Sequence, residues 1–104
     1  MKITILNSAK QKIRLTAKYI HKEFGASSRE TFIAEINKIV GLLRSNPMLG
    51  PIESLLEGAS VSYRSIVVMR LNKIVYWVNG DIIEIVDFWH CRRNPQAQAG
   101  RLMK

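Results

Sequence analysis

The sequence predicts an α+β fold with an N-terminal strand, an antiparallel two-helix hairpin, and an antiparallel β-meander that the helices cover on one face. Three observations predict it. Segments 63–69, 73–78 and 81–89 are rich in Ile, Val, Tyr, Trp and Phe, which favour strands. Segments 9–24 and 27–45 repeat apolar residues at helical spacing. The 104 residues, 47% of them apolar, are enough for one domain, 1–104, with a modest core.

The first strand and the first helix are predicted over residues 2–24. Residues 2–6 alternate well enough for a short strand, and Asn7 or Ser8 is suited to cap the helix that Gly25 ends. The apolar side of the helix consists of Ile13, Ala17, Ile20 and Phe24. Basic residues recur every four positions at Lys10, Arg14, Lys18 and Lys22. We interpret this ridge as a solvated face rather than a nucleic-acid site, because four like charges repel one another.

The second helix starts at a capping box, in which Ser27 and Glu30 satisfy each other's backbone N–H groups, and it ends at Asn46-Pro47. Its apolar stripe consists of Phe32, Ile36, Ile39, Val40 and Leu43. The short link 25–26 makes the two helices antiparallel neighbours. Residues 48–62 form an irregular connection into the sheet.

The meander has a register that its turns predict. Asn79-Gly80 favours a type I′ turn with Val78 opposite Asp81, and residues 70–73 place Arg70 opposite Lys73 as a two-residue turn or a four-residue loop. Because side chains alternate along a strand, this register assigns them to two faces. The predicted inner face holds Tyr63, Ser65, Val67, Met69, Ile74, Tyr76, Val78, Ile83, Ile85, Asp87 and Trp89. The predicted outer face holds Arg64, Ile66, Val68, Arg70, Lys73, Val75, Trp77, Ile82, Glu84, Val86, Phe88 and His90.

The predicted outer face is apolar in its middle, with Trp77 and Phe88, and basic around it, with Arg64, Arg70 and Lys73. An exposed apolar patch of this kind indicates a surface that a partner covers. The net charge of +8 and the pI of about 10.1 favour an anionic partner.

The sequence also bears on disulfides, metal sites and the location of the protein. Its one cysteine, Cys91, excludes an internal disulfide, and we expect a buried structural thiol. No Cys/His spacing indicates a metal site, and we expect no cofactor. The N-terminal residues lack the apolar segment of a secretory signal, and no apolar run reaches the roughly 20 residues that span a bilayer. We therefore expect a cytoplasmic protein that is not bound to a membrane.

Short motifs, in order and spacing, resemble the RelE/ParE superfamily of toxins from bacterial type II toxin–antitoxin systems. They cover most of the chain. The motifs are Tyr19-Ile20 to Phe24-Gly25, Leu42 to Asn46-Pro47, Leu49-Gly50, Tyr63 to Val68, Lys73 to Tyr76, Asp87-Phe88-Trp89 and Arg92-Arg93-Asn94-Pro95. The closing Arg-x-Asn-Pro run is more similar to the ParE side, the plasmid stabilisation proteins, than to the RelE side.

The resemblance implies a small α+β toxin that a cognate antitoxin neutralises by wrapping it with an extended, often acidic segment. The resemblance does not decide between two cellular targets. RelE-like members cut messenger RNA on the ribosome, with basic residues and a C-terminal Tyr or a His/Glu pair. ParE-like members lack those residues and poison DNA gyrase. No Tyr follows Tyr76 in this chain, so the C-terminal Tyr is absent.

If the chain is a ribonuclease, the resemblance assigns the phosphate-binding cations to Arg64, Lys73 and Arg93, and His90 with Glu84 is the remaining acid/base pair. The residues that we expect to contact a target or the antitoxin are Arg64, Arg70, Lys73, Trp77, Phe88, Arg92 and Arg93. We also expect the inward Asp87 to pair with an Arg or to accept a hydrogen bond from a backbone group.

The preferred hypothesis is a ParE-like toxin that inhibits growth by binding a target such as DNA gyrase and is neutralised by its antitoxin. Whether the chain is an enzyme stays open. The alternative is a ribosome-dependent mRNA endonuclease, and the third reading, based on charge alone, is a non-toxic nucleic-acid-binding module.

Overall fold

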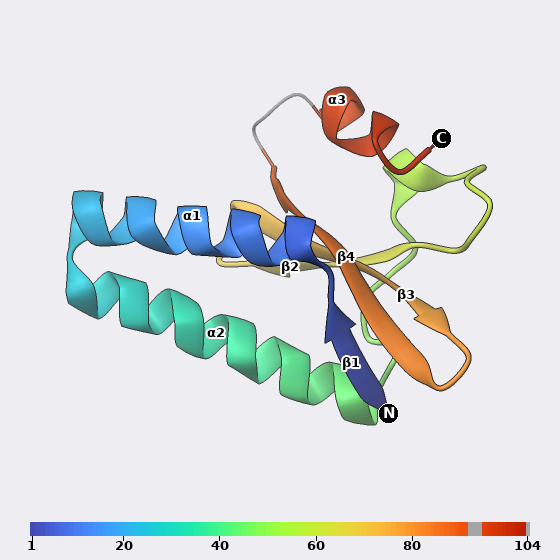
Figure 1. The fold of residues 1–104 in the computed structure, drawn as a ribbon, viewed down its shortest axis with the longest axis horizontal. Coiled ribbons are helices and arrows are strands. Elements are labelled where there is room, and N and C mark those ends of the chain that lie inside the picture. The colour runs from blue at the N-terminus through green and yellow to red at the C-terminus, as the bar shows by residue number, and fades with distance from the viewer. Residues whose placement is uncertain (92–94, 104) are drawn as a thin grey trace.

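The computed structural model describes residues 1–91 and 95–103 and confirms the α+β fold. Its elements are β1 (Lys2–Ile5), α1 (Asn7–Phe24), α2 (Ala26–Ser45), the 3-10 helix η1 (Ser54–Leu56), β2 (Arg64–Val68), β3 (Asn72–Asn79), β4 (Ile82–His90) and α3 (Pro95–Gly100). The four described strands form one sheet in the order β1-β4-β3-β2. β1 lies parallel to β4, whereas the other two pairings are antiparallel. Figure 1 shows α1 and α2 as antiparallel neighbours joined by a tight link.

The two helices form as their apolar spacing predicts, but not through the predicted caps. Phe32, Ile36, Ile39 and Leu43 are buried on α2, and Gly25 ends α1 at a φ of +93° that disfavours other residues. Neither helix has a side-chain hydrogen bond at its N-cap, so the predicted caps at Asn7 or Ser8 and at Ser27 are wrong. Both helices are instead stabilised by packing against the sheet.

The helix-covered face of the sheet forms the main core. Its fully buried strand residues are Val68, Ile74, Tyr76, Ile83 and Ile85. The prediction that β3 and the first half of β4 direct Ile74, Tyr76, Ile83 and Ile85 inward is therefore confirmed. The turn between these strands lies at Gly80-Asp81, because Asn79 pairs with Ile82 rather than Val78 with Asp81. This shift of two positions keeps the same residues on each face.

The predicted faces of β2 are wrong. Val68 pairs with Asn72, so the connection has three residues, 69–71, instead of two or four. An odd change in register exchanges the faces of a strand. Val68 is buried against the helices, and Val67 is exposed.

The predicted faces of the end of β4 are also wrong, because the strand contains a β-bulge. Tyr76 pairs with Ile85 but Val75 pairs with Asp87, which leaves Val86 as the additional residue. After the bulge Phe88 turns inward and meets Phe32 edge to face, with ring centroids 6.0 Å apart. Trp89 turns to the opposite face.

That opposite face carries a second apolar cluster covered by the chain itself. Val75, Val86 and Trp89 are buried under Leu56 of η1 and Ala99 of α3. In Figure 1 α3 lies beside the segment that carries η1. The C-terminal residues 95–100 thus form a short helix over the sheet.

Candidate partner-binding surface

The broad apolar face expected on the meander is largely closed. Val75 and Val86, in its predicted centre, are buried in the second cluster, and Trp77 is half-buried against that cluster. Phe88 is buried in the main core, so the expectation that it lies on the outer face is wrong. Arg92 and Arg93 lie outside the described residues. A partner therefore meets η1 and α3 on this face rather than an uncovered sheet.

Exposed apolar side chains occur instead in the connection before β2, on β2 itself and in the turn after it, and Leu49, Ile52 and Val67 among them line one cleft. Seven of them have exposed fractions between 37% and 57%. They are Met48, Leu49, Ile52, Leu55, Val67, Met69 and Leu71. We call this group the edge surface. The sequence analysis missed its members in the connection, because irregular segments have no periodicity, although several apolar residues around Gly50-Pro51 were a signal.

The connection is held against β2 by backbone pairing. Ser65 N–H donates to Pro51 O and Glu53 N–H donates to Tyr63 O, and Ile52 forms a bridge with Arg64. Because N–H and C=O groups alternate in direction along a strand, those of Val67 also point away from β3. The described connection does not reach that far, so the edge of β2 is open at Val67.

A buried tyrosine fixes the shape of the same connection. Tyr76 Oη accepts from Gly50 N–H at 2.9 Å and donates to Pro47 O at 2.8 Å. Burial raises the pKa of Tyr76 in spite of the hydrogen bond from Gly50 and the charge of Arg64. Arg64 donates to Gly50 O at 2.8 Å. A side chain at position 50 would have its Cβ 2.5 Å from Ser65 O, so only glycine allows this approach.

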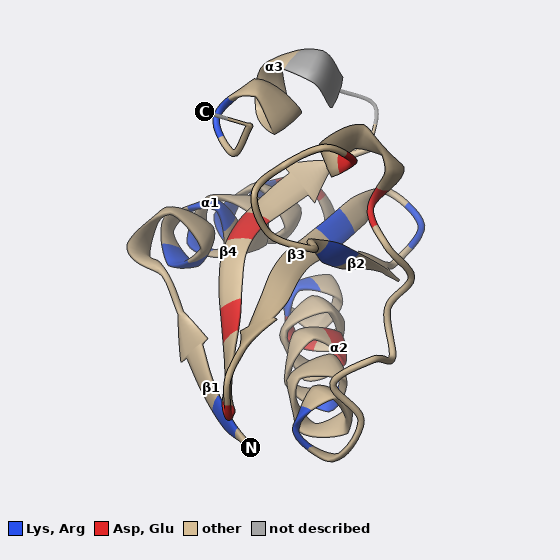
Figure 2. Ribbon diagram, turned by 90° about the vertical axis from the view of Figure 1, so that its right-hand side faces the viewer, with Lys and Arg blue, Asp and Glu red and all other residues tan. Residues whose placement is uncertain are grey.

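A charged cluster borders the edge surface. Lys73 Nζ lies 2.7 Å from Glu53 Oε1, and that carboxylate also accepts from Ser65 Oγ and Leu55 N–H. Burial acts to raise the pKa of Glu53, but these hydrogen bonds outweigh it and leave the pKa below its ordinary value. In Figure 2 basic segments of β2 and β3 lie side by side near this connection. A cleft of about 340 Å³ is lined by this cluster together with Leu49 and Ile52.

The β2–β3 turn has an unusual backbone. Met69 and Arg70 adopt φ values of 50° and 71°, the left-handed region that costs non-glycine residues about 1–2 kcal/mol each. Both side chains are exposed. The turn therefore presents an apolar side chain and a cation at the end of the edge surface, at a cost in stability.

The structure does not bring the candidate ribonuclease residues together. Arg64 faces the connection near Gly50, Lys73 lies on the opposite face bound to Glu53, and His90 shares the face of Phe88. Arg93 lies outside the described residues. Glu84 and His90, expected to share a face, point to opposite faces because of the bulge. They are six positions apart, which is about 20 Å along the strand.

His90 lies at the end of β4 beside α1. Its backbone N–H donates to Gln98 Oε1 at 3.0 Å, and Gln98 Nε2 donates to His90 O at 3.1 Å. A cavity of about 480 Å³ next to it is bordered by Tyr19 of α1 and Asn72 of β3. Cys91 follows and is exposed, so the expectation of a buried thiol is wrong.

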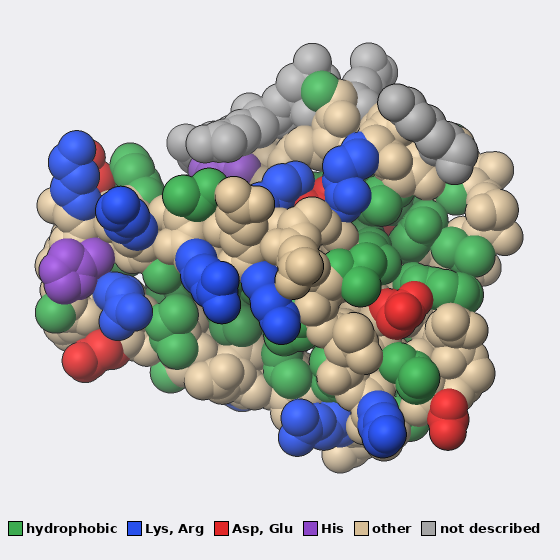
Figure 3. Space-filling view, viewed as in Figure 1, with side chains coloured by type: hydrophobic (Ala, Val, Ile, Leu, Met, Phe, Trp, Pro, Cys, Tyr) green, Lys and Arg blue, Asp and Glu red, His purple; other side chains and the backbone are tan. Residues whose placement is uncertain are grey.

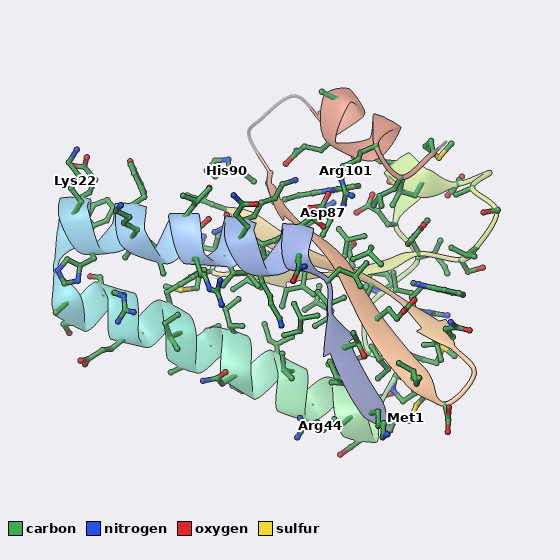
Figure 4. All side chains as sticks on the ribbon, in the orientation of Figure 1. Met1, Lys22, Arg44, Asp87, His90 and Arg101 are labelled. Atoms are coloured by element: carbon green, nitrogen blue, oxygen red, sulfur yellow. The ribbon has the colours of Figure 1, made fainter. Side chains whose placement is uncertain are left out.

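Asp87 is fully buried, and it pairs with an Arg and accepts from a backbone N–H, as the sequence analysis expected. It accepts from Phe88 N–H at 2.9 Å and Trp89 Nε1 at 2.8 Å, and it lies 2.8 Å from Lys12 Nζ and 3.0 Å from Arg101 Nη2. Burial acts to raise its pKa, but these partners lower the pKa below its ordinary value. Figure 4 shows Arg101 directed toward Asp87. We interpret this cluster as structural.

Within residues 1–91 and 95–103, no group of three or more His, Cys, Asp or Glu side chains is arranged to hold a metal ion. Over the same residues, none of the helices combines the length and apolarity that crossing a bilayer requires.

Comparison with known proteins places the chain among toxins. Residues 3–95 match the family described as the ParE toxin of the type II toxin–antitoxin system, parDE. A solved structure titled as the chromosomal ParDE toxin–antitoxin system from P. aeruginosa superposes with a TM-score of 0.70. Its sequence is 14% identical, and the match covers 86% of this chain and 95% of that one. No curated protein matches the chain.

Proposed function

The chain belongs to the ParE family of type II toxins, and from this premise we propose that a cognate antitoxin neutralises it at the edge surface and that it acts by binding its target. Membership of the family confirms the resemblance that the sequence motifs indicated. The observation that supports docking at the edge surface is the exposed apolar group along β2, bordered by Arg64, Arg70 and Lys73.

The chemistry of the edge surface fits a segment that is apolar and acidic. Ile52, Val67 and Met69 offer apolar contacts, and Arg70 and the net charge of +8 attract carboxylates. An extended segment can also pair with the free backbone groups of Val67, as partners do when they add a strand to an open sheet edge.

Action by binding, rather than by RNA cleavage, is supported by the positions of the candidate catalytic residues. Acid/base catalysis requires groups within hydrogen-bond reach of one phosphodiester. Lys73 is occupied by Glu53, and it points to the face opposite to His90. We therefore propose a target such as DNA gyrase, the ParE-type alternative, with the ribosome and its mRNA as the competing target.

Growth and two biochemical readouts test the proposed action. Expression of the chain alone should arrest growth, induce the DNA damage response and leave mRNA intact, and the purified chain should inhibit gyrase supercoiling. His90→Ala should keep this activity. If mRNA is cut at ribosome-bound codons and His90→Ala abolishes the cuts, the chain is a ribonuclease and the binding mechanism is wrong.

Antitoxin docking is tested by co-expression with the product of the adjacent gene. Val67→Glu should weaken capture of the antitoxin by about tenfold or more. The substitution places a carboxylate on the edge surface, where it would repel the acidic segment of the antitoxin. Leu15→Glu is the matched control, since Leu15 is similarly exposed but lies on α1, outside the edge surface. Equal loss of capture in both variants would show that the edge surface is not the docking site.

A further inference from the structure

The cavity beside His90 lies at the end of the sheet, where β3 and β4 meet α1 and α3. Its volume of about 480 Å³ is within the range of small-molecule sites in proteins. Its lining includes Lys12 and Tyr19 from α1, Asn72 from β3 and Phe88 from β4. In Figure 4 His90 lies directly above α1, and Figure 3 shows hydrophobic side chains beside the histidine at that place. The cavity shares no lining residue with the edge surface.

Asn72 is a polar group of this cavity that the described part of the chain leaves without a partner. The residue is only 7% exposed, and its side-chain amide makes no hydrogen bond to any residue that the structure describes. Over the same residues, no polar side-chain atom is both sealed from solvent and unpaired, so the amide opens into the cavity that it lines.

The neighbouring polar side chains of the cavity are different, because they are already engaged. Thr16 Oγ1 donates to Lys12 O at 2.8 Å. The amide of Gln98 both accepts from and donates to the backbone of His90. Asn72 is therefore the amide that is available to a ligand.

An unpaired buried amide indicates what kind of ligand would fit. Burying an amide without a hydrogen-bond partner is unfavourable, so buried amides are nearly always paired. A carboxamide carries an N–H donor and a C=O acceptor side by side. The complementary ligand edge has an acceptor next to a donor, as adenine has at N7 and N6, and Asn pairs with these two atoms through two hydrogen bonds.

The rest of the lining favours a planar ligand that carries a negative charge. Tyr19 is 59% exposed at the rim, where its ring can stack on a base, and the buried Phe88 adds an apolar wall. None of the described lining residues is acidic. Lys12 shares the single carboxylate of Asp87 with Arg101, so this group of three has a net positive charge. A phosphate near Lys12 would be attracted by that excess charge.

We propose that this cavity binds a free adenine nucleotide, with the edge of the base on the Asn72 amide, its ring on Tyr19 and its phosphate toward Lys12. The site goes beyond the proposed toxin action and antitoxin docking, and it depends on neither. An unstacked adenine of a single-stranded nucleic acid offers the same chemistry, and the test separates the two sources.

The test uses the full chain and isothermal titration calorimetry with three ligands. AMP should bind with a submillimolar Kd. Purine riboside 5′-monophosphate lacks the 6-amino donor, so it should bind about tenfold more weakly. Adenosine lacks the phosphate, so it should bind several-fold more weakly than AMP at low salt, and this difference should shrink as salt screens the charges.

Asn72→Leu keeps the approximate size of the side chain and removes the amide. The Kd for AMP should rise roughly 10- to 100-fold, and the variant should no longer distinguish AMP from the analogue without the amino group. Because the amide has no partner in the described protein, the melting temperature should be unchanged or higher. The control is Asn79→Leu, at an exposed position at the other end of β3, which should leave the Kd unchanged.

Tyr19→Ala tests the stacking of the base. It should raise the Kd for AMP by roughly tenfold, and Tyr19→Trp should restore binding, because a larger ring also stacks. The matched control is Phe24→Ala, which removes an exposed aromatic ring from the same helix outside the cavity. This control should bind AMP as the wild type does.

Three results would overturn the proposal. One is no binding of AMP at millimolar concentration. Another is equal affinity of the wild type and Asn72→Leu for AMP, which would show that the amide does not contact the base. The last is a single-stranded adenine oligonucleotide that binds far more tightly than AMP and loses this affinity in Asn72→Leu and Tyr19→Ala, which would assign the cavity to nucleic acid. None of these results depends on growth arrest or on antitoxin capture, so failure here is separable from failure of the toxin mechanism.

Discussion

Asp87→Asn is the substitution that tests most directly how the fold is held together. Asp87 is 0% exposed and joins β4 to α1 through Lys12 and to the C-terminal segment through Arg101. It also accepts from two buried donors, Phe88 N–H and Trp89 Nε1. The substitution keeps the size of the side chain, so the change in stability reports on charge and hydrogen bonding rather than on packing.

The expected loss is the sum of two contributions. An amide offers one oxygen, so at least one of the two buried donors loses its acceptor, which costs about 1–3 kcal/mol. Lys12 and Arg101 are 41% and 45% exposed, and they regain water when the charge is removed, so each ion pair contributes only about 0.2–1 kcal/mol. The free energy of unfolding should therefore fall by about 1.5–5 kcal/mol, a large part of the 5–15 kcal/mol that such domains have.

Urea unfolding followed by tryptophan fluorescence measures this loss, because Trp89 is buried beside the substituted residue. The control is Asp81→Asn, the same chemical change at an exposed turn position, which should alter stability by less than about 0.5 kcal/mol. If Asp87→Asn costs no more than Asp81→Asn, the cluster contributes nothing and the reasoning is refuted.

The same carboxylate predicts a pH dependence. Its pKa is lowered in the folded chain from an ordinary 3.8, because the hydrogen bonds and charges of its partners outweigh burial. A lowered folded pKa means that the carboxylate's contribution is fully present above about pH 4 and is lost as the pH falls through the folded pKa. Unfolding free energy measured from pH 6 down to pH 2 should fall more steeply for the wild type than for Asp87→Asn. Parallel curves would contradict the lowered pKa.

Three further substitutions test the connection and the turn by the same urea assay. Gly50→Ala should cost about 1–3 kcal/mol, because its Cβ would lie 2.5 Å from Ser65 O; an unchanged midpoint would show that the backbone moves freely there. Tyr76→Phe should cost about 1–3 kcal/mol by leaving the Gly50 N–H without its acceptor, and a neutral result would mean that water replaces the hydroxyl. Arg70→Gly should raise stability by about 0.5–1 kcal/mol, since φ there is 71°, and a loss would show that Arg70 makes a stabilising contact.

Local sequence patterns predicted the elements well. Apolar spacing identified α2 through Phe32, Ile36, Ile39 and Leu43, all of which are buried. Periodicity is a property of one segment and its burial, so a single sequence carries it. The predicted N-caps were wrong although Ser8 and Ser27 have suitable side chains. Each helix begins before its serine, at Asn7 and at Ala26, and Ser8 Oγ donates to Val86 O instead.

Register was harder to predict, because two irregular features in the sheet have no glycine to mark them. The β2–β3 turn places Met69 and Arg70 in the left-handed region, which bulky residues rarely adopt. The bulge at Val86 likewise has no sequence mark. Each feature changes the register by an odd number, so the turn exchanges the predicted faces of β2 and the bulge exchanges those of the end of β4.

The candidate site was predicted in part. Arg64, Arg70 and Lys73 do lie around an exposed apolar group, but that group is at the edge of β2 rather than on the sheet face. The difference arises from residues distant in sequence. Leu56 and Ala99 cover the face. No local sequence pattern predicts which part of a sheet an irregular connection or a C-terminal segment will cover.

The bulge exchanges the faces of the end of β4 and helps to hold the C-terminal segment over the sheet. β1 pairs with β4 only as far as Ile5 and Ile85. At Val86, the additional residue of the bulge, the backbone carbonyl instead accepts hydrogen bonds from Ser8 Oγ and Arg101 Nη2. The change of face that the bulge causes also buries Trp89 against Ala99 of α3. This contact helps to hold the C-terminal segment on the sheet face. A partner that uses this face would first have to displace α3, whereas the edge of β2 is open without any rearrangement. The edge is therefore the part of the sheet at which a neutralising segment can begin to pair, and Val67 is where that pairing should start.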